Sequence, residues 1–176
     1  MPEMYEIYEK HADRYDELIR AEDHRDNLRR LLHETVNWRG LSVIEGGVVT
    51  GRVIRLYIEH PASSVCCDRS QHMLNFAQEI LSLYEDKLRF VRADKTNIPE
   101  FGGGFDVFVE GWSFGHSASD CSIANEVRGM TDILIHNAIR DLRPGGVVIV
   151  KKHSSKMISS SILFDRYIIF VANPHL

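Results

Sequence analysis

The sequence predicts an α/β protein of the Rossmann-like, doubly wound type, with a mostly parallel sheet, helices on both faces and an N-terminal helical cover. From Leu41 onward, short apolar runs alternate with longer helical patterns, and the first run ends in a glycine-containing turn. The 176 residues are 44% apolar and 26% charged, which is ordinary for one packed core. We therefore expect a single domain with a helical cover (1–40), a core (41–151) and a shortened C-terminal tail (152–176).

The predicted elements follow from the spacing of apolar residues. The expected helices are 5–20, 26–36, 51–60, 71–84 and 123–142. The expected strands are 41–45, 63–67, 88–93, 105–110 and 147–151, with at most one or two more in 162–171. Ser70 suits the N-cap of the helix that follows it. A sheet shortened in this way leaves an exposed apolar edge strand. We expect that the tail covers this edge, that a second copy of the chain pairs with it, or that the protein is prone to aggregate through it.

Composition narrows the classes of partner. With 21 basic and 25 acidic residues the formal net charge is -4, and no dense basic stripe suggests nucleic acid. No apolar stretch approaches the ~20 residues that cross a bilayer, and the acidic start is unlike a signal peptide, so we expect a cytoplasmic protein without a membrane partner. The cysteines lack a disulfide or zinc spacing and the histidines form no compact cluster, so no metal is expected.

The stretch VIEGGVVTGR (43–52) places glycines directly after a predicted buried strand. In an open α/β sheet this turn lies at the carboxyl edge of the strands, where ligands bind. Asp68 and Asp94 follow the next two predicted strands and should share that edge. Asp68 has the position of a carboxylate that accepts both hydroxyl hydrogen bonds of a ribose. The alternatives are that Asp68 caps a helix with Ser70 and that Asp94 only forms a turn.

Five stretches carry a resemblance to a known family: YEKHADRYDE, VIEGGVVTGR, VCCDRSQHML, FVRADKTNIPEFGGGFDVFV and LRPGGVVIV. In order and spacing, from about residue 5 to 151, they resemble the class I S-adenosylmethionine-dependent methyltransferases. The resemblance implies S-adenosylmethionine as cofactor and in-line methyl transfer to a small-molecule acceptor. Since the cofactor brings the activated methyl group, the protein would act mainly by holding the two reactants in position.

The resemblance also implies roles for individual residues. The methionine end of the cofactor would be lined by Glu45, Gly47 and Gly51. Asp68 would hold the ribose hydroxyls, and Asp94 with Lys95 would border the adenine. The residues nearest the sulfonium and the acceptor would be Glu110, Gly111 and Trp112. Three neighbours complete the expected cofactor-binding set: Gly46, Arg69 and Met73.

His116 is the candidate general base, because it follows the fourth predicted strand and an unperturbed imidazole titrates near pH ~6.5. The alternative is a loop histidine with no role in proton transfer. Tyr8 and Tyr15 either cover the acceptor or simply pack at helical spacing.

One position of the glycine motif departs from the family pattern of an acidic residue followed by alternating glycines. Val49 replaces the middle glycine, and a β-branched residue is poorly suited to positive φ and intrudes beside a ligand. Val49 and the short C-terminus would also be expected in a catalytically inactive relative that has been retained as a binding domain. That relative is the main alternative to an active enzyme.

The segment Gly111–Gly115 also matches the G-x-S-x-G nucleophile elbow of hydrolases. Ser113 would then need a later acid and histidine, for which the candidates are Asp141 with His153 and Asp165 with His175. Helical periodicity begins near Ile123 instead of at the serine, which disfavours this reading. A nicotinamide-dependent dehydrogenase is weaker still, because Val48 stands where its motif needs the second glycine.

Overall fold

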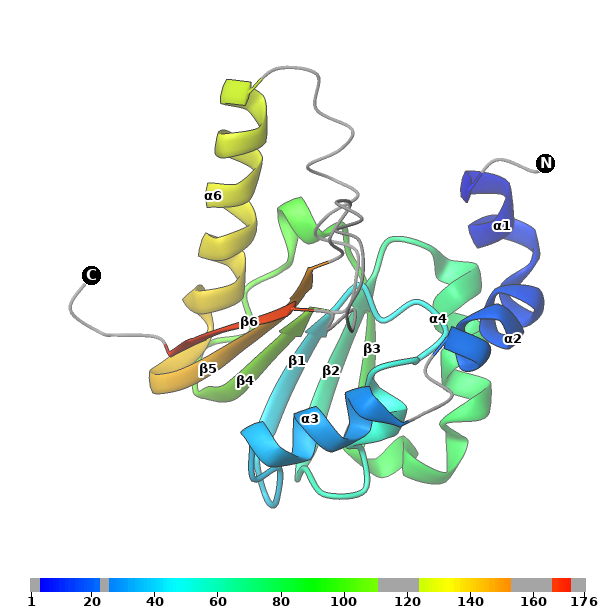
Figure 1. Cartoon of the computed structure of the whole chain (residues 1–176), viewed down its shortest axis with the longest axis horizontal. Helices are drawn as coiled ribbons and strands as arrows, with labels where there is room; N and C mark the ends of the chain where they lie inside the picture. The colour runs from blue at the N-terminus through cyan, green and yellow to red at the C-terminus, as the bar shows by residue number, and fades with distance from the viewer. Residues whose placement is uncertain (1–3, 23–25, 111–123, 153–165, 172–176) are drawn as a thin grey trace, which may run out of the picture.

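The computed structural model describes residues 4–22, 26–110, 124–152 and 166–171, and its centre is a sheet in the order β3-β2-β1-β4-β5-β6 (Figure 1). The strands are β1 (Ser42–Gly46), β2 (Ser63–Asp68), β3 (Leu88–Arg92), β4 (Phe105–Glu110), β5 (Leu142–Lys152) and β6 (Arg166–Val171). The first five run parallel, and β6 is antiparallel to β5. The predicted doubly wound α/β class is confirmed.

Helices and 3-10 turns connect the strands. The α-helices are α1 (Met4–Lys10), α2 (Ala12–Glu22), α3 (Asn27–Thr35), α4 (Gln71–Ile80) and α6 (Ala124–Arg140). The 3-10 helices are η1 (Ile54–Leu56), η2 (Ser82–Lys87) and η3 (Lys95–Asn97). Figure 1 shows α1 and α2 beside α4, away from α6.

Two apolar cores lie on opposite faces of the sheet because successive strand residues point to opposite sides. Val43 joins the core formed with α3, η1 and α4, whereas its neighbour Ile44 joins the core that includes Ala138 of α6. Both side chains are almost fully buried. Burial on both faces explains why β1 reads as a continuous apolar run.

The predicted helix over 51–60 is wrong. The segment forms turns around η1, with the amide of Ile58 donating to the carbonyl oxygen of Ile54 at 2.9 Å. The buried residues Val53, Ile54, Tyr57 and Ile58 have the spacing of one helical face, but the three that are β-branched lower the helix propensity of the segment, which is consistent with turns in place of a helix.

The remaining boundaries differ by small amounts. The expected helix 5–20 is two helices that meet at His11, and the expected helix 71–84 ends at Ile80 and continues as η2. Ser70 is confirmed as an N-cap, since its hydroxyl accepts the amide hydrogen of Met73 at 3.3 Å. β5 begins five residues earlier than expected, with a register shift against β4.

The C-terminal tail resolves the open question of the sheet edge. β6 pairs along β5 from Lys152↔Arg166 to Val147↔Val171, so a strand of the tail covers that edge. Within the described ranges, no helix is long and apolar enough to cross a membrane.

Candidate cofactor site

Four acidic residues stand at or just after the carboxyl ends of four neighbouring parallel strands. Glu45 precedes the last residue of β1, Asp68 and Glu110 end β2 and β4, and Asp94 follows β3 by two residues. Because these strands are adjacent and parallel, the four residues lie along one edge of the sheet. This places together carboxylates separated by up to 65 positions in the sequence, 45 to 110.

The turn after β1 keeps a glycine-like path despite its valine. Gly47 and Gly51 have φ of 68° and 80°, and Val49 has φ of 49°, in the left-handed region. This conformation costs a residue with a side chain about 1–2 kcal/mol. The amide of Val48 donates to the carbonyl oxygen of Cys67 at 3.0 Å, which fastens the turn to β2. The sequence argument that valine is ill suited here is correct about strain, and the strained backbone is nevertheless adopted.

Asp68 holds the strained turn directly. Its Oδ2 accepts the amide hydrogen of Val49 at 2.9 Å, and its Oδ1 accepts that of Ser70 at 2.9 Å. The carboxyl group is buried, and this desolvation raises its pKa although the two backbone hydrogen bonds oppose the rise. Each carboxylate oxygen can accept a second hydrogen bond, so the two amides do not exhaust the group. The expected capping contact with Ser70 is present together with a link to the turn.

Asp94 is the exposed member of the group. Its Oδ1 accepts hydrogen bonds from the amide and the hydroxyl of Thr96, at 2.9 and 2.7 Å, as the turn alternative requires. Burial raises its pKa, but the Thr96 bonds and the charges of Arg69 and Lys95 bring it below the usual value. Arg69 and Lys95 act on Asp68 as well, so the two strand ends share one charge cluster.

Glu45 is the most deeply buried carboxyl, with 1% of its surface exposed. The hydroxyl of Tyr57 donates to its Oε2 at 2.5 Å, and the ring of Tyr57 stacks on Trp38 with 4.1 Å between centroids. Burial, aided by the nearby charge of Glu110, raises the pKa of Glu45 to about 8, against the hydrogen bonds from Tyr57 and the backbone of Ile54. The raised pKa of Glu45 favours its protonated, neutral form at this edge of the sheet.

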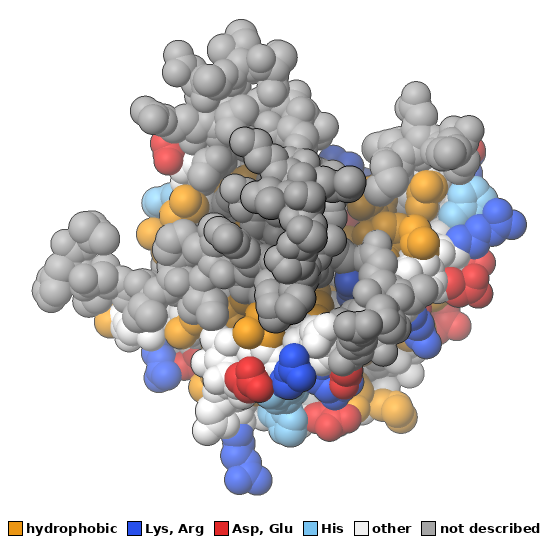
Figure 2. All heavy atoms as spheres, viewed as in Figure 1, with side chains coloured by type: hydrophobic (Ala, Val, Ile, Leu, Met, Phe, Trp, Pro, Cys, Tyr) orange, Lys and Arg blue, Asp and Glu red, His pale blue; other side chains and the backbone are white. Residues whose placement is uncertain are grey.

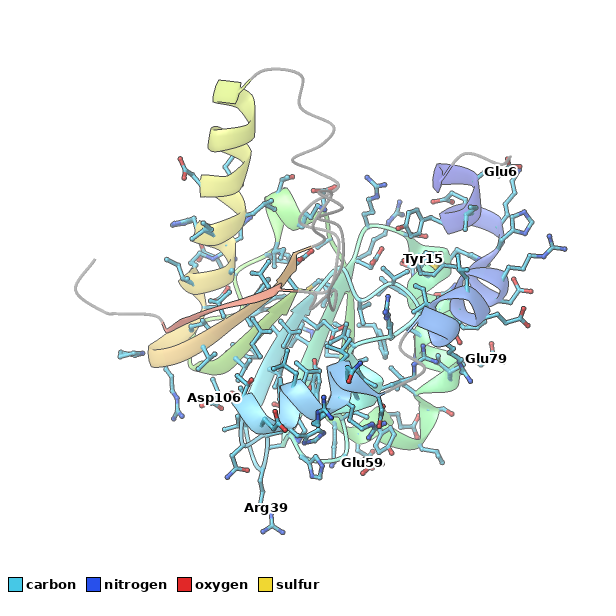
Figure 3. The ribbon with its side chains drawn as sticks, viewed as in Figure 1. Glu6, Tyr15, Arg39, Glu59, Glu79 and Asp106 are labelled. Atoms are coloured by element: carbon cyan, nitrogen blue, oxygen red, sulfur yellow. The ribbon has the colours of Figure 1, made fainter. Side chains whose placement is uncertain are left out.

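The N-terminal helices are tied to both sides of the turn. Arg55 donates from Nε to the carbonyl oxygen of Gly51 at 3.1 Å and from its terminal nitrogens to both carboxylate oxygens of Asp16 on α2. Ser70 donates its hydroxyl hydrogen to the carbonyl oxygen of Tyr8 at 3.0 Å. The predicted helical cover thus reaches the carboxyl edge. In Figure 3, Tyr15 lies on this side, whereas Asp106 lies near the other end of the strands.

Sequence reasoning missed three residues of this arrangement: Asp16, Arg55 and Tyr57. The sequence held a signal for Asp16, which follows Ala12 by four positions and precedes Ile19 by three. This spacing puts it on the buried face of its helix, where a carboxylate needs a charged or hydrogen-bonding partner. Tyr57 and Arg55 left none, because both were read as parts of an ordinary helix.

For several of the predicted cofactor-binding residues, the structure gives a position, while their role stays a prediction. Met73 is wholly buried, Gly46 is buried against Phe108, and Arg69 is exposed. Gly111, Trp112 and His116 lie outside the described residues. Among the residues that the structure describes, no group of three or more His, Cys, Asp or Glu side chains could hold a metal ion.

The position of Asp141 argues against its role as the acid of a serine hydrolase. Asp141 precedes β5 and accepts the amide hydrogens of Phe101 and Gly103 at 3.0 and 3.2 Å. It therefore lies at the amino edge of the sheet, away from the end of β4 that leads to Ser113. Ser113, His153, Asp165 and His175 lie outside the described residues.

Solved structures share this fold. A methyltransferase from Clostridium acetobutylicum matches with a TM-score of 0.61 and 21% identity over 80% of this chain and 55% of its own. The N-methyltransferase NodS from Bradyrhizobium japonicum matches with a TM-score of 0.62 and 15% identity over 75% of this chain and 71% of its own.

A third match is phosphoethanolamine N-methyltransferase 1 from Haemonchus contortus, in complex with phosphoethanolamine and S-adenosylhomocysteine. Its TM-score is 0.60 at 16% identity, over 78% of this chain and 28% of that enzyme, so the chain spans only part of such relatives. No family model and no curated protein sequence matches the chain significantly. The fold of this chain is that of the class I S-adenosylmethionine-dependent methyltransferases.

Proposed function

We propose that the protein transfers a methyl group from S-adenosylmethionine to a small-molecule acceptor. The carrying observation is the row of acidic residues at four parallel strand ends beside a turn that keeps left-handed backbone at Gly47, Val49 and Gly51. Carboxylates suit two parts of this cofactor, because they accept hydrogen bonds from the ribose hydroxyls and favour the cationic sulfonium.

The residues present fit the cofactor. Asp68 has lone pairs left after its two backbone bonds and would accept from the ribose hydroxyls. The turn residues Glu45, Gly46, Gly47 and Gly51 would surround the methionine part. Asp94 with Lys95 would border the adenine, and Arg69 and Met73 lie in the segment between. The cofactor supplies the activated methyl group when bound.

The acceptor side of the proposal rests on the end of β4. Glu110 with Gly111 and Trp112 would lie near the sulfonium, and His116 would remove a proton where the acceptor needs it. Acidic and basic side chains are interspersed on the described part of the face in Figure 2, which favours a small acceptor over nucleic acid. We also propose that the enzyme is cytoplasmic and has no membrane partner.

Titration calorimetry with S-adenosylmethionine and S-adenosylhomocysteine tests the proposal. We expect dissociation constants of about 1–100 μM for both ligands. Asp68→Asn should weaken binding by about 1–3 kcal/mol, because it removes a charged acceptor, whereas Asp106→Asn at the other end of the sheet should not. No heat with either ligand at millimolar concentration contradicts the proposal.

The catalytically inactive relative is the second candidate, and the side chain of Val49 at the turn favours it. An inactive binding domain would bind both ligands and transfer no methyl group to any acceptor in a small-molecule screen. Release of S-adenosylhomocysteine in that screen decides for the enzyme.

A further inference from the structure

The N-terminal cover, formed by α1 and α2, packs on the fold outside its two apolar cores. The rings of Tyr8 on α1 and Tyr15 on α2 lie 5.4 Å apart between centroids, which joins the two helices. Ala12 and Ile19 of α2 are buried, but neither belongs to the core on either face of the sheet. The cover lies beside α4 instead (Figure 1). It can therefore open locally while the sheet and its cores stay intact.

One polar link ties α2 to the end of the glycine-containing turn. The Nε of Arg55 donates to the carbonyl oxygen of Gly51 at 3.1 Å, and its two terminal nitrogens donate to the two carboxylate oxygens of Asp16. The side chain of Arg55 is 20% exposed and that of Asp16 is 5% exposed, so water screens this pair only weakly. We call these three groups the Arg55 clasp. The clasp makes the position of α2 depend on the backbone of the turn.

A second polar link ties α1 to the same turn from the other side. The hydroxyl of Ser70 donates to the carbonyl oxygen of Tyr8 at 3.0 Å. The amide of Ser70 donates to Oδ1 of Asp68, whose Oδ2 accepts the amide hydrogen of Val49, both at 2.9 Å. The two links therefore close a ring that runs from the cover through Asp68 and the turn to the Arg55 clasp and back to the cover.

Resting on the proposed function, we propose that docking of the cover and binding of the cofactor stabilise each other, with Asp16 acting on the turn through Arg55. A cofactor held by Asp68 and the turn fixes the two places to which the cover is bonded. A docked cover in turn holds the turn in the conformation that binds. Such coupling is reciprocal, so the factor by which the docked cover raises affinity equals the factor by which the ligand favours docking. Asp16 needs no contact with the cofactor for this effect, which makes it a positioning residue.

Hydrogen exchange of the full chain, with and without saturating S-adenosylhomocysteine, tests the effect of the ligand on the cover. We expect the ligand to slow exchange in α1 and α2 by about tenfold more than in α3, because only the cover is bonded to the turn and to Ser70. A ligand that merely stabilises the folded state slows exchange wherever it requires global unfolding, without preference for the cover. Equal slowing in the three helices would overturn the proposal.

Calorimetric titration of variants with S-adenosylhomocysteine tests the effect of the cover on the ligand. Asp16→Asn should weaken binding by about tenfold and reduce the additional slowing of exchange in α1 and α2. Arg55→Lys keeps the positive charge but loses the two-point bond to the carboxylate, so it should also weaken binding. This second variant decides the question if Asp16→Asn does not fold.

Arg20→Gln is the matched control. Arg20 donates from Nε to the same carboxylate of Asp16 at 2.8 Å, but it does so from within α2, and its side chain is mostly exposed. Its loss leaves the Arg55 clasp in place, so the affinity for S-adenosylhomocysteine should change by less than about twofold. An equal loss of affinity in Arg20→Gln and Asp16→Asn would overturn the role of the clasp.

The two proposals fail differently. If the original protein and the folded clasp variants bind S-adenosylhomocysteine with equal affinity, the coupling is overturned and the proposed function stands. If the original protein binds neither S-adenosylhomocysteine nor S-adenosylmethionine, the proposed function is overturned and this inference with it.

Discussion

Val49 carries the largest local conflict between residue type and backbone. A left-handed backbone at a β-branched residue costs about 1–2 kcal/mol, and the hydrogen bond from its amide to Asp68 helps to hold it. The strain is retained at the point where the turn meets the proposed cofactor edge. Glycine would adopt the same path without strain.

Comparing two substitutions at this position isolates the strain from the loss of the side chain. Val49→Gly should be more stable than Val49→Ala by about 1 kcal/mol, because only alanine keeps the left-handed penalty. At Val53, where φ is -80°, the order should reverse. Chemical denaturation of the four variants measures both differences. Alanine equal to or better than glycine at position 49 would contradict the observed backbone.

At the scale of elements, the helical cover is fastened by a small number of polar contacts. Asp16 is buried on α2 and is bonded to Arg55, which also holds the carbonyl of Gly51. Burial raises the pKa of Asp16, but Arg55 lowers it to below its usual value. The ion pair therefore stabilises the fold above the unfolded pKa of about 4 and is lost as pH falls through the lower folded value.

Asp16→Asn should loosen the cover, because it leaves the largely buried guanidinium of Arg55 without its charged partner. We expect a loss of about 1–3 kcal/mol in unfolding free energy and faster hydrogen exchange in α1 and α2. The control is Glu6→Gln, which breaks the exposed pair with Lys10 and should change stability by less than about 0.5 kcal/mol. Equal effects of the two substitutions would show that the cover is held by apolar packing alone.

At the scale of the whole molecule, acidic residues with raised and with lowered pKa values give stability opposite dependences on pH. The folded-state pKa of Glu45 is raised to about 8, so the folded protein keeps a proton that the unfolded chain releases above its pKa of about 4.5. Stability from this group is present at low pH and falls as pH rises through this window. Asp16 and Asp94, whose pKa values are lowered, contribute in the opposite direction at lower pH.

Glu45→Gln should therefore gain stability relative to the original protein as pH rises. Between pH 5 and 8 the difference in unfolding free energy should grow by up to about 1.4 kcal/mol per pH unit. Urea denaturation at three pH values measures it, with Asp106→Asn as the control. A difference that does not change with pH would place the carboxyl in water.

Sequence and tertiary structure decided different parts of this protein. Hydrophobic periodicity and glycine placement in the sequence determined the alternation of strands and helices that implies a parallel sheet. They could do so because a strand and a helix each bury apolar residues at a characteristic spacing. The same sequence pattern placed Asp68 and Asp94 at strand ends, because each follows directly after an apolar run that predicts a strand.

Only the folded structure decided how the acids are held. The bond from the amide of Val49 to Asp68, the partnership of Glu45 with Tyr57 and the link from Asp16 to Arg55 join residues 12 to 39 positions apart. No periodicity encodes such pairings, because they depend on which side chains share a buried space once the sheet is formed. The tertiary structure likewise overrode the helical pattern of 51–60, whose buried residues Val53, Ile54, Tyr57 and Ile58 have helical spacing but lie in turns around η1.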